Sequence, residues 1–274
     1  MSEIRGTLVW IDGRSEPVDE WKEQIGLVYK TPLLYEVVRT VRYVPLFLED
    51  YYERLSNSFQ LTGNRVPVTL AETGKIIRSV AKANRIPDGP VKLLLPLEGR
   101  HSVLAFCMVP HLPAPEDYDH GVQVAFLEAE RDMPNAKRWN NKLRVQAERL
   151  LEQTGAYEAL LVNHHGVVTE GSRSNIFLFR GDEIVTTPDE LVLPGITRKK
   201  VLQLCREQEI EVKYDCIKRS QLVEWESMVV TGTSRRLVPV RDAGEIRFRT
   251  DQPLMRRLMN GFDLLVDRYL EEHQ

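Results

Sequence analysis

Two ionisable residues in separate segments define the chemistry that this sequence could perform. Lys137 lies in a short loop, PNAKRWNN (134–141), and Glu170 lies further along, in VVTEGSRSNIFLF (167–179). A lysine amine can form a Schiff base with an aldehyde cofactor, and a carboxylate can hold the protonated nitrogen of a pyridine ring. Together the two residues suggest a pyridoxal-phosphate site. Neither is decisive alone, because most lysines and hairpin glutamates are solvated surface charges.

A later segment, LPGITRKKVLQL (193–204), supplies groups that suit a phosphate. Gly195 permits a tight turn, Thr197 can cap the helix that follows, and the first free N–H groups of that helix form an anion site. The threonine hydroxyl adds a donor. The ordinary alternative is a helix N-cap with no ligand.

Two more segments offer phosphate or carboxylate ligands. In TGTSRR (231–236), Gly232 lets the backbone approach a ligand closely, while Thr233 and Ser234 present hydroxyls and consecutive N–H groups. Arg54, in EDYYERL, carries a guanidinium whose geometry matches phosphate. Alternatively, TGTSRR is an ordinary turn without a ligand, and Arg54 is a solvated surface charge.

The composition excludes several classes of function. The chain has 274 residues, 42% hydrophobic and 28% charged, with a net charge of −3, so we expect no general attraction to nucleic acid or to anionic membranes. No apolar run approaches the roughly 20 residues that span a bilayer. The N-terminus lacks the pattern of a secretory signal. The cysteines, Cys107, Cys205 and Cys216, have no metal-type spacing and do not predict a disulfide framework, so a cytoplasmic protein without a metal is expected.

Proline-rich sequence around 108–121 divides the chain into two predicted α/β parts. We expect an α+β N-terminal domain over 1–112, a linker over 113–121, and a larger cofactor-binding domain over 122–274. In the first domain, Thr69 to Glu72 predicts a capping box that opens a helix. The predicted strands of this domain are 8–13, 33–41, 91–95 and 103–109.

The second domain is predicted to alternate helices with hairpins. Apolar residues at helical spacing and turn residues between apolar runs mark these elements. The predicted helices are 141–153, 197–209 and 251–270; the hairpins join 159–163 to 167–171 and 175–179 to 183–187; and 227–231 is a further strand.

The set of motifs resembles a known family, the class IV (fold-type IV) pyridoxal-phosphate aminotransferases. That family includes branched-chain aminotransferases, D-amino-acid aminotransferases and aminodeoxychorismate lyases. The resemblance covers nearly the whole chain. It is carried, in the family's order, by LLYEVVRT (33–40), PLFLEDYYERLSNS (45–58), NAKRWN (135–140), VTEGSRSNIF (168–177), LPGITR (193–198) and TGTSRRLVPV (231–240).

The resemblance implies a role for each matched residue. Lys137 matches the lysine that binds the cofactor aldehyde and shuttles a proton, and Glu170 matches the acid beside the pyridine nitrogen. Tyr35 falls where the family has an aromatic residue lining the substrate pocket. The implied phosphate ligands are Arg54, Ile196, Thr197 and Thr233. A homodimer with small-molecule substrates is also implied.

The sequence departs from the family at positions that bear on substrate. The D-amino-acid type has a tyrosine near the position of Lys92, and an Arg-x-His loop that Arg100-His101 only approximates. The branched-chain type commonly has a tyrosine where this chain has Lys142. The phosphate turn is generally followed by small or acidic residues, whereas here it continues with Arg235 and Arg236.

These departures leave the substrate open. Lys92, Arg100 or Arg235 could pair with a substrate carboxylate, or be solvated or paired with protein acids. The candidates for substrate binding are Tyr35, Lys92, Ser234 and Arg235. The leading hypothesis is amino transfer between a 2-oxo acid and either a D-amino acid or a branched-chain L-amino acid. The alternatives are a lyase that releases pyruvate and 4-aminobenzoate from aminodeoxychorismate, and a non-catalytic pyridoxal-phosphate-binding relative.

Overall fold

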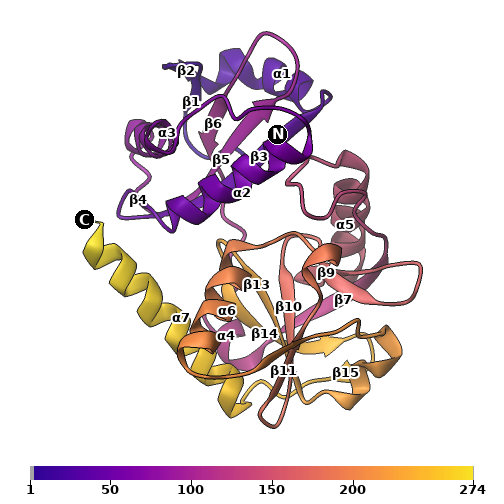
Figure 1. Ribbon diagram of the computed structural model, residues 1–274. Coiled ribbons are helices and arrows are strands. Elements are labelled where there is room, and N and C mark those ends of the chain that lie inside the picture. Colours follow the sequence, from indigo (N-terminus) through magenta and orange to yellow (C-terminus); the bar gives the residue numbers. More distant parts are fainter. Residues whose placement is uncertain (1–2, 274) are drawn as a thin grey trace. The chain divides into compact units, whose positions relative to one another are not determined.

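The computed structural model describes residues 3–273, which form two compact units (Figure 1). Unit 1 comprises the chain up to His111, the short segment Ala136–Trp139, and the C-terminal residues from Val266. Unit 2 comprises Leu112–Asn135 and Asn140–Leu265. The lysine segment therefore folds with unit 1, although the sequence on both sides of it belongs to unit 2.

Unit 1 is built on an antiparallel sheet of six strands in the order β2-β1-β6-β5-β3-β4. The strands are β1 (Leu8–Ile11), β2 (Arg14–Pro17), β3 (Leu33–Val41), β4 (Val44–Pro45), β5 (Gly89–Pro96) and β6 (Leu104–Cys107). The helices are α1 (Val18–Val28), α2 (Leu48–Leu61) and α3 (Leu70–Ala83). In Figure 1, α2 crosses in front of the strands of this sheet.

The sequence signals explain these elements. The capping box is confirmed, because the Thr69 hydroxyl accepts from the Glu72 N–H (3.2 Å) and the Glu72 carboxylate accepts from the Thr69 N–H (2.7 Å). The helix that it opens buries Ile76, Ile77 and Val80, as its apolar spacing predicts. In β3 the alternation of side chains places Tyr35 on one face of the sheet and its neighbours in sequence on the other.

Unit 2 is built on a larger mixed sheet that curls on itself. Its strand order is β12-β11-β10-β13-β14-β7-β8-β9, with β15 paired to β14. The strands are β7 (Val122–Glu128), β8 (Glu158–Val162), β9 (Val168–Gly171), β10 (Asn175–Arg180), β11 (Glu183–Thr186), β12 (Val212–Tyr214), β13 (Ser227–Gly232), β14 (Arg236–Ala243) and β15 (Ile246–Arg247). The helices are α4 (Asp117–His120), α5 (Asn141–Thr154), α6 (Ile196–Glu207) and the first part of α7 (Pro253–Glu272), whose residues from Val266 belong to unit 1. There are 3-10 turns at Asp189–Leu191 and Arg219–Glu224.

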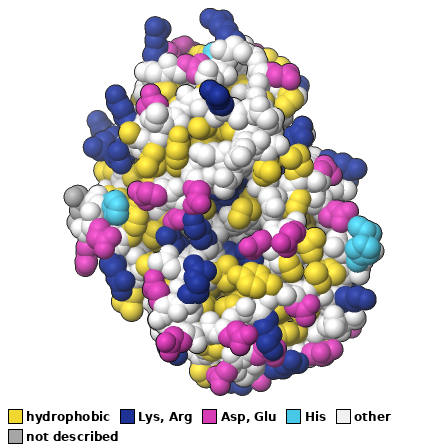
Figure 2. Space-filling model, in the orientation of Figure 1, with side chains coloured by type: hydrophobic (Ala, Val, Ile, Leu, Met, Phe, Trp, Pro, Cys, Tyr) yellow, Lys and Arg dark blue, Asp and Glu magenta, His cyan; other side chains and the backbone are white. Residues whose placement is uncertain are grey.

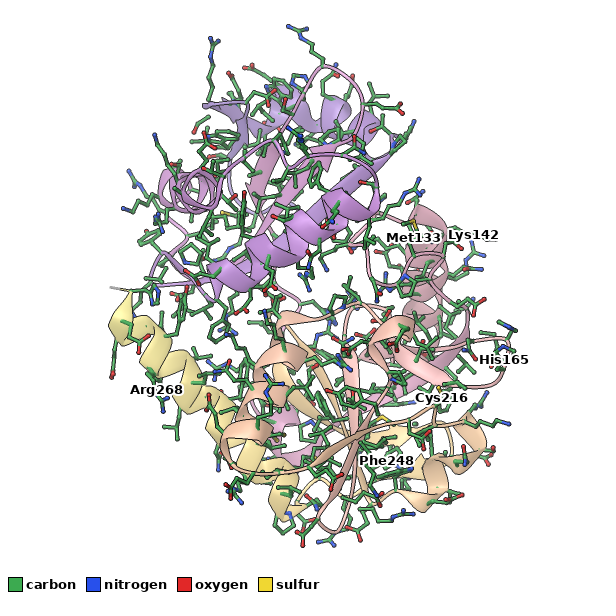
Figure 3. All side chains as sticks on the ribbon, viewed as in Figure 1. Met133, Lys142, His165, Cys216, Phe248 and Arg268 are labelled. Atoms are coloured by element: carbon green, nitrogen blue, oxygen red, sulfur yellow. The ribbon has the colours of Figure 1, made fainter. Side chains whose placement is uncertain are left out.

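Both predicted hairpins of this unit are confirmed, since β8 pairs with β9 and β10 pairs with β11 in antiparallel register. The predicted helices and the strand over 227–231 are present with small shifts of their ends. One detail was wrong: α6 begins at Ile196 with Gly195 as its N-cap, so Thr197 is the second helical residue and does not cap. The core of the unit contains Phe248, labelled in Figure 3.

The surface carries charges of both signs. Figure 2 shows acidic and basic side chains interspersed over the face in view, as expected for a small net charge. Among residues 3–273, no helix is long and apolar enough to cross a membrane.

Candidate functional site

The backbone around Lys137 is fixed along the start of β3 in unit 1. The Lys137 carbonyl accepts from the Tyr35 N–H (3.1 Å), and the Trp139 N–H donates to the Leu33 carbonyl (3.1 Å). Arg138 forms an antiparallel bridge with Leu34 between them. The segment thus extends the sheet beside the strand that carries Tyr35.

Ser58 joins the lysine segment to helix α2. Its hydroxyl accepts from the Lys137 N–H (3.1 Å) and donates to the carbonyl of Arg54 (2.9 Å). The Lys137 ammonium nitrogen lies 4.8 Å from the centre of the Tyr35 ring. Three residues that the sequence nominated, Lys137, Arg54 and Tyr35, are therefore held together by unit 1 alone.

Arg54 is a buried cation with a carboxylate partner. Its Nε and Nη2 donate to the two oxygens of Glu36, at 2.8 and 2.5 Å. Burial would lower the pKa of Arg54, but the charge of Glu36 and the hydrogen bonds to it prevail and raise it. These two parallel hydrogen bonds to Glu36 fix the orientation of the Arg54 guanidinium.

Lys92 is fully buried on the same face of the sheet as Tyr35. Its Nζ donates to the Glu3 carboxylate (3.0 Å). It also lies 4.3 Å from the centre of the Trp139 ring, 4.8 Å from that of Tyr29 and 5.4 Å from that of Tyr35. The ammonium group is stabilised by the Glu3 carboxylate and by the surrounding aromatic rings. Of the alternatives that the sequence left open for Lys92, the structure therefore shows pairing with an acidic residue of the protein.

Glu170 is buried at the end of β9 in unit 2, where three donors orient it. Arg131 Nε donates to Oε1 (2.6 Å), while the Asn175 amide (3.3 Å) and the Leu193 N–H (3.2 Å) donate to Oε2. The Asn175 amide also donates to the Leu193 carbonyl (2.8 Å). The carboxylate is thereby tied to the loop that leads into α6.

The N-terminus of α6 lies directly after that loop. A Cβ on Gly195 would meet the Asn175 side-chain oxygen at 2.0 Å, so the close packing requires glycine here. Ile196 and Thr197 are buried in the first turn, whose charged residues are basic. A helix N-terminus has a partial positive charge, while Arg198 in this turn is paired with Asp189 (2.5 Å).

The turn after β13 is a three-residue loop, since Gly232 pairs with Arg236. The loop holds Thr233, Ser234 and Arg235. Arg235 is buried, and its Nη1 donates to Glu158 Oε2 (2.6 Å). As with Lys92, its partner in the structure is a protein carboxylate.

Comparison with known proteins identifies the family. The model of the family "Amino-transferase class IV" matches residues 33–243. The chain belongs to the class IV aminotransferases. Its enzymes use pyridoxal phosphate, so this chain is a pyridoxal-phosphate-dependent transferase of mixed α/β fold.

Relatives of this class IV aminotransferase align along most of its length. It is 28% identical to a probable branched-chain-amino-acid aminotransferase of Thermotoga maritima, over 94% of this chain and 96% of the relative. It is 26% identical to the D-alanine aminotransferase of Bacillus licheniformis, over 76% and 77%. The crystal structure of a putative branched-chain amino acid aminotransferase from T. maritima superposes with a TM-score of 0.81, at 27% identity, covering 94% of this chain and 95% of that one.

The residues present fit the family's cofactor. Each unit has a group whose chemistry suits a dianionic phosphate: the Arg54 guanidinium in unit 1, and in unit 2 the N-terminus of α6, where packing against Asn175 requires Gly195. Glu170 is a carboxylate of fixed orientation, as a ring nitrogen requires, and Lys137 supplies the amine.

Several residues of the site were not nominated from sequence. Glu36, Ser58 and Asn175 lie inside the motifs that carry the family resemblance, so a finer comparison of those segments could have found them. Arg131 and Glu158 lie outside the motifs. Their partners, Glu170 and Arg235, are distant in sequence, and no local pattern connects them.

The three residues left without a role have distinct surroundings in this class IV aminotransferase. Lys142 is exposed at the start of α5, as Figure 3 shows. Arg100 is exposed in the loop between β5 and β6, where the neighbouring His101 contacts Asp12 (2.9 Å). Arg236 Nη1 donates to Asp263 (2.7 Å).

Proposed function

We propose that this enzyme transfers an amino group between an amino acid and a 2-oxo acid, with a branched-chain L-amino acid or a D-amino acid as donor. The two relatives described above, named for these two donor classes, support the proposal. The main structural support is the Ser58 hydroxyl, which forms hydrogen bonds to the backbones of both Lys137 and Arg54. These bonds link the segment that holds the proposed Schiff-base lysine to the helix that holds the proposed phosphate ligand. Both relatives are named aminotransferases, which favours transfer over the lyase alternative.

Six residues make up the proposed cofactor site. Bound pyridoxal phosphate supplies an aldehyde that accepts an amine and a ring that takes up electrons from the substrate Cα. With the cofactor bound, Lys137 Nζ would take the Cα proton as a base and give it back as an acid, and Glu170 would hold the ring nitrogen. The phosphate ligands are Arg54, Ile196, Thr197 and Thr233.

The substrate side of the site is proposed to contain Tyr35, Lys92, Ser234 and Arg235. Tyr35 lies beside the Lys137 amine, and Ser234 lies in the turn after β13. Lys92 and Arg235 are buried in ion pairs, so they act on substrate by positioning their neighbours. For Lys92 the neighbour is the Tyr35 ring.

We also propose that the enzyme is a cytoplasmic homodimer, as its family resemblance implies. Light scattering on the purified holoenzyme should give the mass of two chains. A monomer that transfers amino groups would contradict the dimer and leave the activity unaffected.

The role of Lys137 is tested by fixing the cofactor to the protein with borohydride. In the wild-type holoenzyme, the peptide that contains Lys137 should gain the mass of the reduced cofactor. Lys137→Ala should lose this labelled peptide and at least about 10³-fold in activity, because the Cα proton then has no base. Lys142→Ala, which removes an exposed lysine nearby, should behave as wild type. Labelling of another lysine with activity retained in Lys137→Ala would overturn the assignment.

A further inference from the structure

Arg173 is an exposed arginine next to the proposed cofactor residues of unit 2. It lies in the turn between β9 and β10, shortly after Glu170 and before Asn175. Its carbonyl oxygen would be 3.3 Å from a Cβ added at Gly232, so this turn and the Thr233 turn pack against each other. Arg173 thus belongs to the same small surface as the residues proposed to bind cofactor and substrate.

The carboxylate near Arg173 is already saturated. Glu158 accepts from Arg235 Nη1 (2.6 Å), from the hydroxyls of Ser172 (2.7 Å) and Ser174 (2.9 Å), and from the Ala159 N–H (2.9 Å). A carboxylate offers about four acceptor positions, and these four donors use them. Arg173 itself makes no hydrogen bond or ion pair within the part of the chain that the structure describes.

The electrostatic balance around Arg173 is therefore positive. Two guanidinium groups, those of Arg173 and Arg235, act on the single carboxylate of Glu158. Loss of hydration lowers the pKa of Arg173, and the charges of Arg235 and Arg144 lower it further, while Glu158 opposes them. The guanidinium stays protonated, so Arg173 presents its positive charge to an anion that binds at this surface.

We propose that Arg173 is a specificity-determining residue that binds the second carboxylate of a dicarboxylic amino acid or 2-oxo acid. The proposal rests on the proposed function, because the ligand is the substrate of that same site. Ser234, in the turn after β13, is the proposed neutral ligand of the carboxylate that every substrate has. Arg173 adds a planar cation beside that turn, and a guanidinium binds carboxylate by two parallel hydrogen bonds.

The first experiment measures steady-state kinetics of the holoenzyme with two acceptors. These are 2-oxoglutarate, which has two carboxylates, and 2-oxohexanoate, which has one. Arg173→Gln should lower kcat/KM for 2-oxoglutarate by about 10- to 100-fold, the usual effect of losing a charge-assisted hydrogen bond. It should change kcat/KM for 2-oxohexanoate by less than about 3-fold. Arg257→Gln, which removes an exposed arginine on α7, should change neither. Equal losses on both acceptors, or none on 2-oxoglutarate, would overturn the proposal.

A binding measurement separates this proposal from the activity. Glutarate and pentanoate, which cannot react, are titrated calorimetrically into wild-type holoenzyme, Arg173→Gln and Arg173→Lys. Wild type should prefer glutarate, Arg173→Gln should lose the preference, and Arg173→Lys should keep part of it. An Arg173-dependent preference in an enzyme that transfers no amino group would overturn the proposed function alone. Identical binding by wild type and Arg173→Gln in an active enzyme would overturn the Arg173 proposal alone.

Discussion

At the scale of single residues, the charged groups that the sequence presents as candidate ligands also organise the protein. Arg54, Lys92 and Arg235 each have a buried or half-buried carboxylate partner within their own unit. Removing one member of a buried pair leaves an uncompensated charge, which costs more than the pair itself contributes. These residues consequently affect stability as well as activity.

Glu158→Gln should destabilise the protein by about 3–5 kcal/mol, because the buried Arg235 would lose its counter-charge. Burial raises the pKa of Glu158, but Arg235 and Arg173 prevail, and the net pKa lies below the ordinary 4.5. Because this pKa is depressed in the folded state, ionised Glu158 stabilises the fold at pH values above about 4.5. That stabilisation is lost as the pH falls through the folded-state pKa. Urea denaturation across pH 3–7 should show this acid loss in wild type and a smaller one in Glu158→Gln.

The matched control is Glu148→Gln, whose carboxylate lies in a half-exposed pair with Arg144 on α5. It should change the free energy of unfolding by less than about 0.5 kcal/mol. A Glu158→Gln variant as stable as this control would mean that the Glu158 network does not hold the turns together.

The thiols should differ sharply in reactivity. Burial raises the pKa of Cys107 and of Cys205 to about 11, so almost no thiolate forms at neutral pH, whereas Cys216 is exposed. A thiol reagent such as DTNB should label one cysteine rapidly in the native protein and all three after denaturation. Cys216→Ser should abolish the rapid phase. Rapid labelling that persists in Cys216→Ser would contradict the burial of the other two.

At the scale of elements, local sequence and long-range packing contribute separately. The start of α3 is predictable because Thr69 and Glu72 satisfy each other's backbone within one turn. The start of α6 was predicted one residue late: Gly195 is the N-cap, and it packs closely against Asn175, which is distant in sequence. Likewise the Lys92–Glu3 pair depends on the pairing of distant strands, which no local pattern specifies.

Thr69→Ala should cost about 1 kcal/mol of unfolding free energy, because the Glu72 N–H loses its side-chain acceptor. The measurement is chemical denaturation followed by far-UV circular dichroism. Thr69→Ser keeps the hydroxyl and should cost much less. Equal losses in the two variants would show that the methyl group, and not the cap, is responsible.

At the scale of the whole molecule, the sequence order of the motifs was enough to predict the family, which the match over residues 33–243 confirms. What the sequence did not show is which charges are already paired. Lys92 and Arg235 were candidates for a substrate carboxylate, and both have protein partners, while Arg173, which has none in the described chain, was not nominated. Pairing depends on side chains that the two sheets bring together from distant parts of the sequence, so it needed the structure.

The central claim, that this chain transfers amino groups, is tested most directly by one half-reaction. The holoenzyme is mixed with single L- and D-amino acids, with no acceptor present, and the cofactor absorbance and the 2-oxo acid formed are followed. The account predicts that at least one branched-chain L-amino acid or D-amino acid converts the cofactor to its amine form and yields one 2-oxo acid per site, after which the reaction stops until a 2-oxo acid is added. Failure of every amino acid to convert the cofactor, or continued turnover without an acceptor, would contradict it.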